Sequence, residues 1–442
     1  MVTRACWLIL LFAGWFMACS RAPKSEPEAL VLRGFRVVDP ASRTVTERDV
    51  VVQGGVVVAS ATSAKLRVVE GRGQFLMPAL WDVKAALWGN NSTKSYDELS
   101  QDMSFSRALA VQLYYGVAHV GVYGPRREWI QRALKRADAL ELLEAELLYP
   151  DLVLCARQRY GCAAVPDGTT LQSLLDDRKQ HAVPFVMIAA SAAQPQQGDV
   201  GLSPALLAAA LHGTRERELR SVVMVDDWQR AAEVAELGAS AVYGLPGGDV
   251  PDALIEQLRE RNVAYAPALA LYLELDQLLG NERALSDPFL TATVQVPVLD
   301  SYRSERDMFQ LWREFLEKGR ARKQQALSSV GRLAKAGVRI LVASDACWAG
   351  TFQGHASHAA QLWLERAGLD GWARLSAATV WPAELMGRRV GFEPGQVADF
   401  LAVAADPRER AEHSRDIRLV IRKGKLVDRE SLLPDLERRE YR

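Results

Sequence analysis

The side chains that could carry out chemistry are few and scattered. Metal-assisted hydrolysis needs neutral imidazoles and carboxylates that converge on one or two divalent ions, which lower the pKa of bound water toward about 7. The chain has six histidines, none of them in an H-x-H pair: His119, His181, His212, His355, His358 and His413. His355 and His358 are spaced i,i+3 and could face one way on a helix, but ordinary loop or helix-start roles are the favoured interpretation. One carboxylate stands out, because Asp345 ends the apolar run 338–345.

Eight apolar, strand-like runs pass through the middle of the chain. The runs are 75–87, 116–123, 152–155, 183–190, 221–225, 239–243, 263–268 and 338–345. Stretches between them show helical spacing, as in 226–237 and 251–261, where apolar residues recur on one side. This alternation over about 250 residues favours an α/β protein with a (β/α)8 TIM-like barrel. A barrel of this kind has its site at the C-terminal ends of the strands, where Asp345 would lie.

The connection between the seventh and eighth runs is far longer than a typical βα loop. It holds 269–303 and then a charged helical region over 304–335. We interpret the insertion near 269–303 as a lid or cap, which could also select the substrate.

Short runs rich in β-branched residues occupy both ends of the folded part. They cover 30–38, 49–53, 56–59, 399–404 and 417–427. Neither end has enough strands for a sandwich of its own. We therefore predict one small β-sandwich assembled from 30–74 and 391–430, flanking a barrel of 75–390.

The first eighteen residues differ in composition from the rest. Arg4 precedes the short apolar segment 7–15, a pattern typical of a signal peptide over 1–18. Residues 16–19 resemble a bacterial lipobox, so we predict a lipidated Cys19 at the start of a polar tether over 19–29. The lipid would make the membrane a partner and place the protein in the bacterial cell envelope, at the outer membrane facing the periplasm. An ordinary cleaved signal or a short anchor is the alternative.

An oxidising compartment bears on the cysteines. Cys155 and Cys162 are seven positions apart, and either a local disulfide or two buried thiols fits this spacing. Cys347 has no obvious partner, and a nucleophilic Cys347 beside His355 or His358 is a weakly supported third mechanism.

Charge composition argues against a nucleic-acid partner. Lys+Arg and Asp+Glu are equal at 54 each in a chain of 442 residues. Such a balance gives no basic footprint for DNA or RNA and no polybasic membrane patch in the sequence as a whole.

Several motifs resemble the amidohydrolase superfamily, in particular its imidazolonepropionase-like branch. The run 75–87 resembles the first barrel strand, P-G-L-I-D-x-H-x-H, and 395–399 resembles G-x-x-A-D-L. The segment 375–387 resembles L-x-A-A-T-x-x-P-A-x-x-L-G. The resemblance extends from about residue 30 to 427. It implies a barrel flanked by a composite β-domain and, for intact relatives, metal-dependent hydrolysis of C–N bonds.

The positions that hold the family's metal carry other residue types here. In strand order, the residues at the histidine positions of strands one, five and six are Lys84, Ala86, Met224 and Gly244. The fourth strand, 183–190, also offers no good ligand. Only Asp345 matches the family, in which that aspartate is typically both a ligand and the proton shuttle. The resemblance therefore supports the fold and predicts that no metal is bound.

Lys84 and Asp345 would lie side by side, because strands one and eight are neighbours in a closed barrel. A carboxylate left without its metal in a water-poor mouth would be costly. Our hypothesis is that the Lys84 ammonium replaces the metal and pairs with Asp345. Otherwise Lys84 extends to water and Asp345 caps the next helix. The side chains expected to line a pocket at the mouth, or to fill the vacated cavity, are Trp81, Trp88, Tyr243, Trp348 and His355.

Two functions fit these observations. The favoured one is a catalytically degenerate, amidohydrolase-like lipoprotein without a cofactor, which binds a small ligand or a protein partner at the barrel mouth. The alternative is a hydrolase that acts on C–N bonds of dipeptides or cyclic amides at a non-standard site. That site would combine Asp345 with Asp226, Asp227 and His355, and a divalent metal such as zinc would be its cofactor.

Overall fold

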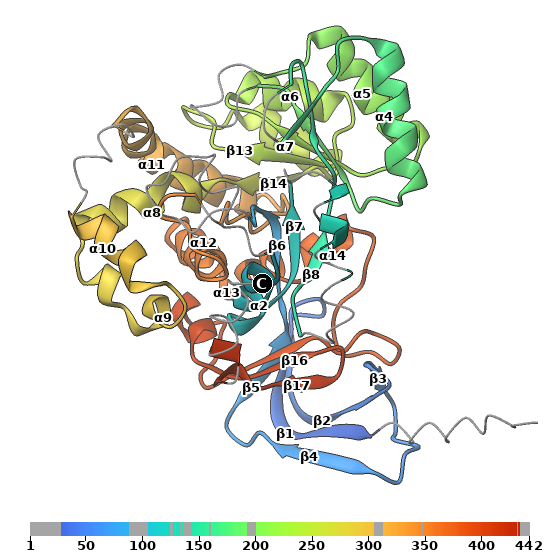
Figure 1. Cartoon of the computed structure of the whole chain (residues 1–442), viewed down its shortest axis with the longest axis vertical. Coiled ribbons are helices and arrows are strands. Elements are labelled where there is room, and N and C mark those ends of the chain that lie inside the picture. The colour runs from blue at the N-terminus through green and yellow to red at the C-terminus, as the bar shows by residue number, and fades with distance from the viewer. Residues whose placement is uncertain are drawn as a thin grey trace, which may run out of the picture.

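The computed structural model describes residues 28–87, 105–123, 127–128, 130–132, 135, 143–158, 161–191, 200–304, 313–346, 348–430 and 432–433. The predicted signal peptide, Cys19, Trp88 and Cys347 lie outside these residues. Figure 1 shows a β-rich part at the lower end, an α/β part above it, and a group of helices, α8 to α11, at the left.

One eight-stranded sheet combines segments from both ends of the chain. Its order is β17-β16-β15-β5-β1-β2-β3, and β4 pairs with β1 off this path. The N-terminal strands are β1 (Ala29–Asp39), β2 (Thr44–Gln53), β3 (Val56–Val58), β4 (Leu66–Glu70) and β5 (Phe75–Pro78). The C-terminal strands are β15 (Phe400–Val403), β16 (Ile417–Arg422) and β17 (Lys425–Val427). The two ends of the chain meet where β5 pairs with β15.

The apolar run 75–87 divides between two sheets. Its first part, β5, belongs to the terminal sheet and not to the barrel region as its sequence suggested. The chain changes sheets after Ala79. The Ala79 N–H donates to the backbone carbonyl of Asp399, next to the terminal sheet, whereas the Leu80 N–H donates to the backbone carbonyl of Gly116, just before β7. The second part forms β6 (Leu80–Ala85).

The terminal sheet curls until its two halves touch. An isolated bridge joins Val56 to Val397, and the Val57 N–H donates to the Gln396 carbonyl at 2.8 Å. The curled sheet encloses a separate apolar core that includes Phe35 and Phe400. The structure therefore has one continuous curled sheet around this core, in place of the predicted sandwich of two packed sheets.

Parallel strands form two further sheets. The first is β6, β7 (Val117–Val122) and β8 (Glu146–Leu148). The second has the order β10 (Cys162–Ala164), β9 (Val153–Cys155), β11 (Val186–Ala189), β12 (Ser221–Met224), β13 (Ala241–Gly244) and β14 (Ala264–Pro267). All described pairings within them are parallel. This is an α/β arrangement consistent with a TIM-like barrel.

The eighth predicted run connects these sheets on one side. It pairs with β14 through the parallel bridge Tyr265–Ile340. On its other side the Val83 N–H donates to Val342 at 3.0 Å, and the Asp345 N–H donates to Lys84 at 2.9 Å. The segment therefore lies between β14 and β6, although it forms only this one bridge.

Helices follow the strands along the chain, and α6 and α7 lie where helical spacing predicted them. They are α2 (Phe105–Tyr114), α4 (Gly168–Gln180), α5 (Pro204–Glu216), α6 (Trp228–Glu236), α7 (Asp252–Glu260), α12 (His355–Arg366), α13 (Gly371–Ala377) and α14 (Val380–Leu385). No helix among the described residues is long and apolar enough to cross a membrane.

The long connection before the eighth run folds into a helical cap. Its elements are α8 (Leu269–Gly280), η2 (Ala284–Ser286), α9 (Pro288–Thr291), α10 (Val296–Ser304) and α11 (Arg313–Lys335). The cap has an apolar core of its own, which includes Leu278, Leu285 and Tyr302. The inserted helices therefore pack against one another around this core.

Candidate functional site

A buried ion pair lies where β6 meets the eighth run, 338–345. The Lys84 ammonium is paired with Asp345 Oδ1, and the two side chains are 1% and 0% exposed. Each charge would be expensive to bury alone, but together they satisfy one another. The structure thus brings together the two residues on which the sequence hypothesis rested.

Two tyrosines enclose the ammonium of this pair. Lys84 Nζ lies 4.1 Å from the ring centroid of Tyr243 and 4.2 Å from that of Tyr123, within the range of cation–π attraction. The Tyr243 hydroxyl also donates to Asp345 Oδ2 at 2.5 Å. The indole N–H of Trp348 donates to the Tyr123 hydroxyl at 3.2 Å. Tyr243 and Trp348 therefore pack around the pair.

The surroundings keep the lysine charged and the tyrosine protonated. Burial lowers the pKa of Lys84, but the charges of Asp345 and Tyr123 and the hydrogen bonds to them together raise it more, so the net pKa lies above the ordinary value. Burial and then the Asp345 charge raise the pKa of Tyr243 well above its ordinary value. Lys84 is consequently a fixed cation and not a nucleophilic amine.

The backbone at Asp345 is strained and held in place. Its φ of 51° lies in the left-handed region, which costs a non-glycine residue about 1 kcal/mol or more. The Thr351 hydroxyl donates to the Asp345 carbonyl at 2.7 Å, and the carboxylate is held by Lys84 and Tyr243. This conformation directs the carboxylate toward β6.

Asp82 is a second buried carboxylate, beside the pair but without a cation. It accepts hydrogen bonds from the N–H of Lys84 at 3.1 Å, the N–H of Ser344 at 3.0 Å and the Ser357 hydroxyl at 2.7 Å. Burial raises the pKa of Asp82 to about 6, although these hydrogen bonds lower it. Asp82 thus connects β6, the eighth run and α12.

The other positions that the resemblance assigns to metal ligands carry no good donor side chain here. Ala86 and Met224 are buried among apolar side chains. Gly244 has a φ of +149°, and a Cβ on it would lie 2.0 Å from the carbonyl oxygen of Val225. No group of three or more His, Cys, Asp or Glu side chains that could hold a metal occurs among the described residues. The donor set around Asp345 does not fit a divalent ion.

Trp81 and His355 lie away from the ion pair, contrary to their predicted place at the mouth. Strand side chains alternate between faces, and Trp81 is an odd number of positions from Lys84. Its ring stacks on His119 with the centroids 3.9 Å apart, beside the terminal sheet. His355 packs near Tyr115 and Phe289 instead.

Two residues of the alternative hydrolytic site, Asp227 and His355, do not converge on Asp345. Asp227 is the N-cap of α6 and accepts a hydrogen bond from the Arg230 N–H at 2.6 Å. The pKa of His355 is lowered to about 4 by burial and then by Arg415, so the imidazole is neutral and enclosed. Neither side chain is part of a cluster with Asp345 in the described structure.

Cys155 and Cys162 form a disulfide in the structure. The bond connects β9 to its parallel neighbour β10 at the edge of the six-stranded sheet. It closes a loop of seven residues, which is short for a large entropic stabilisation.

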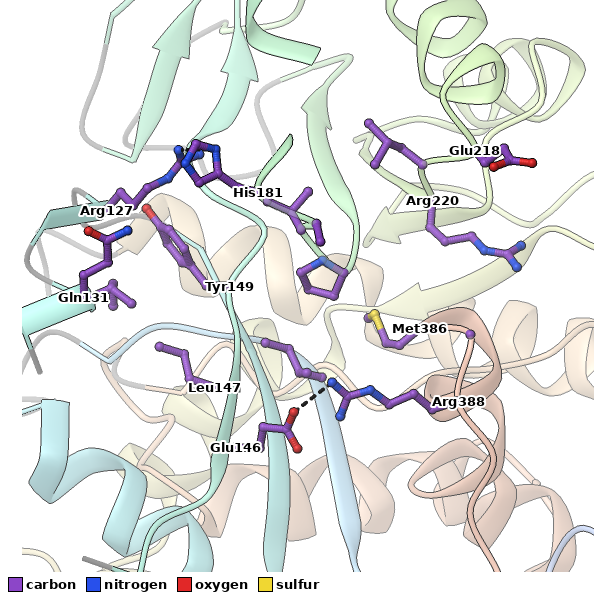
Figure 2. Close-up of a pocket in the computed structure, with 17 residues that line it drawn as sticks. Arg127, Gln131, Glu146, Leu147, Tyr149, His181, Glu218, Arg220, Met386 and Arg388 are labelled. Carbon is purple, nitrogen blue, oxygen red and sulfur yellow. Dashed lines mark hydrogen bonds and ion pairs between the residues drawn. The ribbon is translucent and has the colours of Figure 1, made fainter. Parts of the chain in front are cut away.

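A cavity of about 640 Å³ lies away from the ion pair. Leu147 of β8, Pro184 before β11 and Arg220 before β12 line it, so it opens between the two parallel sheets. Figure 2 shows Arg127 and His181 against each other on one side, and Arg388 reaching Glu146 below. Sequence reasoning missed this cavity because its walls come from separate segments that share no motif.

The charged walls of the cavity are preorganised by ion pairs. Arg388 Nη2 lies 2.8 Å from Glu146 Oε1, and Arg127 Nη2 lies 2.7 Å from Asp177 Oδ2. Burial raises the pKa of Glu146, but His119 and Arg388 lower it more, to far below its ordinary range. Glu146 is therefore ionised, and the arginines are held by anions.

Comparisons with known proteins locate the fold. No family model matches the sequence, and no curated protein matches it either. A protein assigned as a prolidase of Bifidobacterium longum matches in structure with a TM-score of 0.69 at 18% identity, covering 93% of this chain and 99% of that one. Molinate hydrolase matches at 0.69 and 14%, covering 92% and 96%. An amidohydrolase matches at 0.68 and 16%, covering 90% and 98%.

At these identities the likeness shows the fold alone. The chain has the fold of amidohydrolase-superfamily proteins, over nearly its whole described length. The names of these neighbours are those of a prolidase, a molinate hydrolase and an amidohydrolase. They do not report which side chains this chain carries at the metal positions.

Proposed function

We propose that this protein is an amidohydrolase-fold lipoprotein of the bacterial cell envelope in which an internal ion pair replaces the catalytic metal, and which binds a ligand without hydrolysing it. The observation that carries this proposal is the complete burial of Lys84 against Asp345. A metal at this place would have to displace a bound ammonium and would gain only one carboxylate. In the same proposal, β8 and β9 are two halves of one barrel strand, which completes an eight-stranded ring with β6, β7, β11 to β14 and the eighth run.

The ligand site in this proposal is the cavity between the parallel sheets. At the barrel mouth, where the sequence placed it, Tyr243 and Tyr123 enclose the Lys84 ammonium. A volume of about 640 Å³ suits a small molecule. Apolar residues such as Leu147 and Met386 form part of its wall, and charged residues such as Arg388 form the rest.

Hydrolysis of C–N bonds is the second candidate function. The names of the structural neighbours favour it. It requires that a substrate reach Asp345, which lies beneath Tyr243 and is fully buried. The two candidates therefore make opposite statements about the importance of Asp345 for turnover.

Turnover measurements on the full chain, purified in detergent, distinguish the candidates. The substrates are a Xaa-Pro dipeptide and an N-acyl amino acid, with and without added Zn²⁺. We expect no hydrolysis above that of the Asp345→Asn variant. Hydrolysis that Asp345→Asn abolishes would overturn the proposal and establish the second candidate.

A thermal-shift screen tests the ligand site itself. A Leu147→Trp substitution would fill part of the cavity, and Val296→Trp on the exposed start of α10 is the control. We expect compounds that raise the melting temperature of the unmodified chain and of Val296→Trp to lose their effect on Leu147→Trp. Compounds that shift all three proteins equally would exclude the cavity as the ligand site.

A further inference from the structure

A second cavity lies at the open end of the curled terminal sheet. It measures about 500 Å³, and its walls come from the start of β1, from β4, and from the β2–β3 and β16–β17 turns. Figure 1 shows these elements in the lower, β-rich part of the molecule. The cavity shares no lining residue with the cavity of about 640 Å³, and its lining includes neither Lys84 nor Asp345.

The floor of this cavity is apolar. Leu30 and Val52 are 5% and 2% exposed and belong to the core of the terminal sheet, and Leu426 packs against that core. An apolar group that enters the cavity would therefore lose its contact with water against this core. Removal of apolar surface from water drives the binding of ligands to sites lined in this way.

The rim of the cavity is cationic. Three cations line it, Arg67, Lys423 and Lys425, together with one acid, Glu28. Arg67 is paired with Leu30 in the parallel register of β4 and β1, so both side chains point to the same face of the sheet. A polar head group held by Arg67 would thus lie beside the apolar floor.

The excess of cations over acids distinguishes this cavity from two others of similar size. The cavity of about 640 Å³ is lined by three arginines, two glutamates and His181. A cavity of about 610 Å³ between α7 and α11 is lined by three cations, which include Arg259 and Lys335, and two acids. A cleft lined mainly by one sign of charge raises the local concentration of the opposite ion. The cavity at the terminal sheet therefore favours an anion more than either of the others does.

Two glycine turns form one wall of the cavity. A Cβ on Gly424 would lie 2.7 Å from Val52 Cγ1 and 3.1 Å from Gly55 Cα, so only glycine lets the two turns pack this closely. The Ala398 N–H donates to the Gly55 carbonyl at 2.9 Å, and the Gly424 N–H donates to the Ala398 carbonyl at 2.8 Å. The wall is thus formed before a ligand arrives, which lowers the entropic cost of binding.

We propose that this cavity binds a single-chain amphiphile with an anionic head, such as a fatty acid of medium chain length. The cations of the rim would bind the head, and Leu30 and Leu426 would contact the alkyl tail. A cavity of about 500 Å³ lies within the usual range of small-molecule sites. This site is separate from the ligand site in the proposed function and does not depend on it.

Isothermal titration calorimetry with hexanoate, octanoate and decanoate, each below its micellar concentration, tests both parts of the site. The chain from Ser20 to Arg442 contains every residue that the structure describes. It lacks the predicted signal peptide and lipid, so it can be studied without detergent, which would compete for an amphiphile site. We expect each added CH₂ to strengthen binding about fourfold until the cavity is filled.

The head group is tested with decanoate and its analogues. High salt should weaken the binding of decanoate, because the attraction between its carboxylate and the exposed cations is screened. Decanol and decyltrimethylammonium have the same alkyl tail without the negative charge, and acetate has the charge without the tail. We expect each of these three to bind far more weakly than decanoate.

Charge variants assign the binding to this cavity. Arg67→Gln with Lys425→Gln should weaken decanoate binding about tenfold in total, because two cations leave the rim. Arg259→Gln with Lys335→Gln is the matched control, since it removes the same residue types from the cavity of about 610 Å³. The control should bind decanoate like the unmodified chain.

A second pair of variants tests the tail. Leu426→Trp would place an indole in the cavity and should reduce the gain in affinity from octanoate to decanoate. Val68→Trp is the control, because Val68 follows Arg67 in β4 and so points to the opposite face of the strand. Circular dichroism confirms that each variant is folded.

Each result has a defined meaning. Equal affinity for the three acids, no binding of decanoate, or decanol binding as tightly as decanoate would overturn the proposal. Unchanged binding by Arg67→Gln with Lys425→Gln would overturn it as well. Acetate binding as tightly as decanoate would show a site for small anions and would also overturn it. None of these measurements involves turnover, so this proposal and the proposed function can fail separately.

Discussion

In the proposed function, the Lys84 ammonium takes, at the residue scale, the place of the divalent ion that the sequence resemblance implies for this fold. It places positive charge beside Asp345, is enclosed by Tyr123 and Tyr243, and stays charged because the carboxylate offsets the cost of burial. A point charge satisfies the aspartate but cannot generate a hydroxide from water. In the proposed function, the site therefore keeps a positive charge beside Asp345 but has no ion that could activate water.

Removing one member of this ion pair should lower the free energy of unfolding far more than replacing both members by apolar residues. Lys84→Ala or Asp345→Asn leaves one buried charge unpaired, and we expect each to lower the free energy of unfolding by about 3–5 kcal/mol. Lys84→Met combined with Asp345→Leu should recover most of that loss, because both charges leave together. Urea unfolding measures all three.

An exposed pair supplies the control for this cycle. Arg43 and Asp370 lie 3.1 Å apart with more than half of each side chain exposed, so Arg43→Ala should cost less than about 1 kcal/mol. If Lys84→Ala also lowered the free energy of unfolding by less than about 1 kcal/mol, Lys84 and Asp345 would not form a buried ion pair.

Gly244 explains why the sixth-strand ligand could not simply be restored. A Cβ there would meet the Val225 carbonyl at 2.0 Å, and the φ of +149° already excludes most side chains. We expect Gly244→Ala to cost at least about 3 kcal/mol in urea unfolding. Gly248→Ala is the control, because its φ is +77° but nothing lies within 4 Å, and it should cost about 1 kcal/mol. Equal losses of unfolding free energy in the two variants would show that the positive φ, and not the contact with the Val225 carbonyl, determines the cost of Gly244→Ala.

At the scale of elements, the cap is fastened to the α/β part by a buried carboxylate. Glu274 of α8 accepts a hydrogen bond from the Trp363 indole of α12 at 2.5 Å. Burial raises the pKa of Glu274 to about 7, while Trp363 and Arg366 lower it. The folded protein therefore holds a proton that the unfolded chain has released between about pH 4.5 and 7.

The pH dependence of stability follows from this difference. The contribution of Glu274 to the free energy of unfolding should be greatest below about pH 4.5. It should fall by about 3 kcal/mol in total as the pH rises to 7. We expect Glu274→Gln to be more stable than the unmodified chain at pH 8 and equal to it near pH 4.5, by urea unfolding. The exposed Glu393→Gln is the control. A constant difference at all pH values would contradict the account.

Particular elements show how far the sequence could predict this structure. Apolar periodicity and capping residues located β7, α6 and α7 to within a few residues, because these patterns arise from local geometry. The split of 75–87 into β5 and β6 could not be predicted, because every residue of both strands is buried and the two strands are separated by only one residue. At the site, the pairing of Lys84 with Asp345 followed from strand adjacency, whereas the positions of Trp81 and His355 depended on side-chain direction.

At the scale of the whole molecule, a polar contact fastens the terminal sheet to the α/β part. Asp399, before β15, lies 3.0 Å from the His119 imidazole of β7 and accepts a hydrogen bond from Arg422 of β16 at 2.5 Å. Burial raises the pKa of Asp399, but His119 and Arg422 lower it more, so its ionised form stabilises the contact. The predicted assembly of one β-domain from both chain ends thus has a specific attachment.

Metal content after loading tests the central claim most directly. The full chain would be incubated with excess Zn²⁺, Mn²⁺ or Fe²⁺, freed of unbound metal and subjected to elemental analysis beside the Asp345→Asn variant. The account predicts far less than one ion per chain in both proteins and no rise in melting temperature. One ion per unmodified chain, lost in Asp345→Asn, would show that Lys84 does not replace the metal.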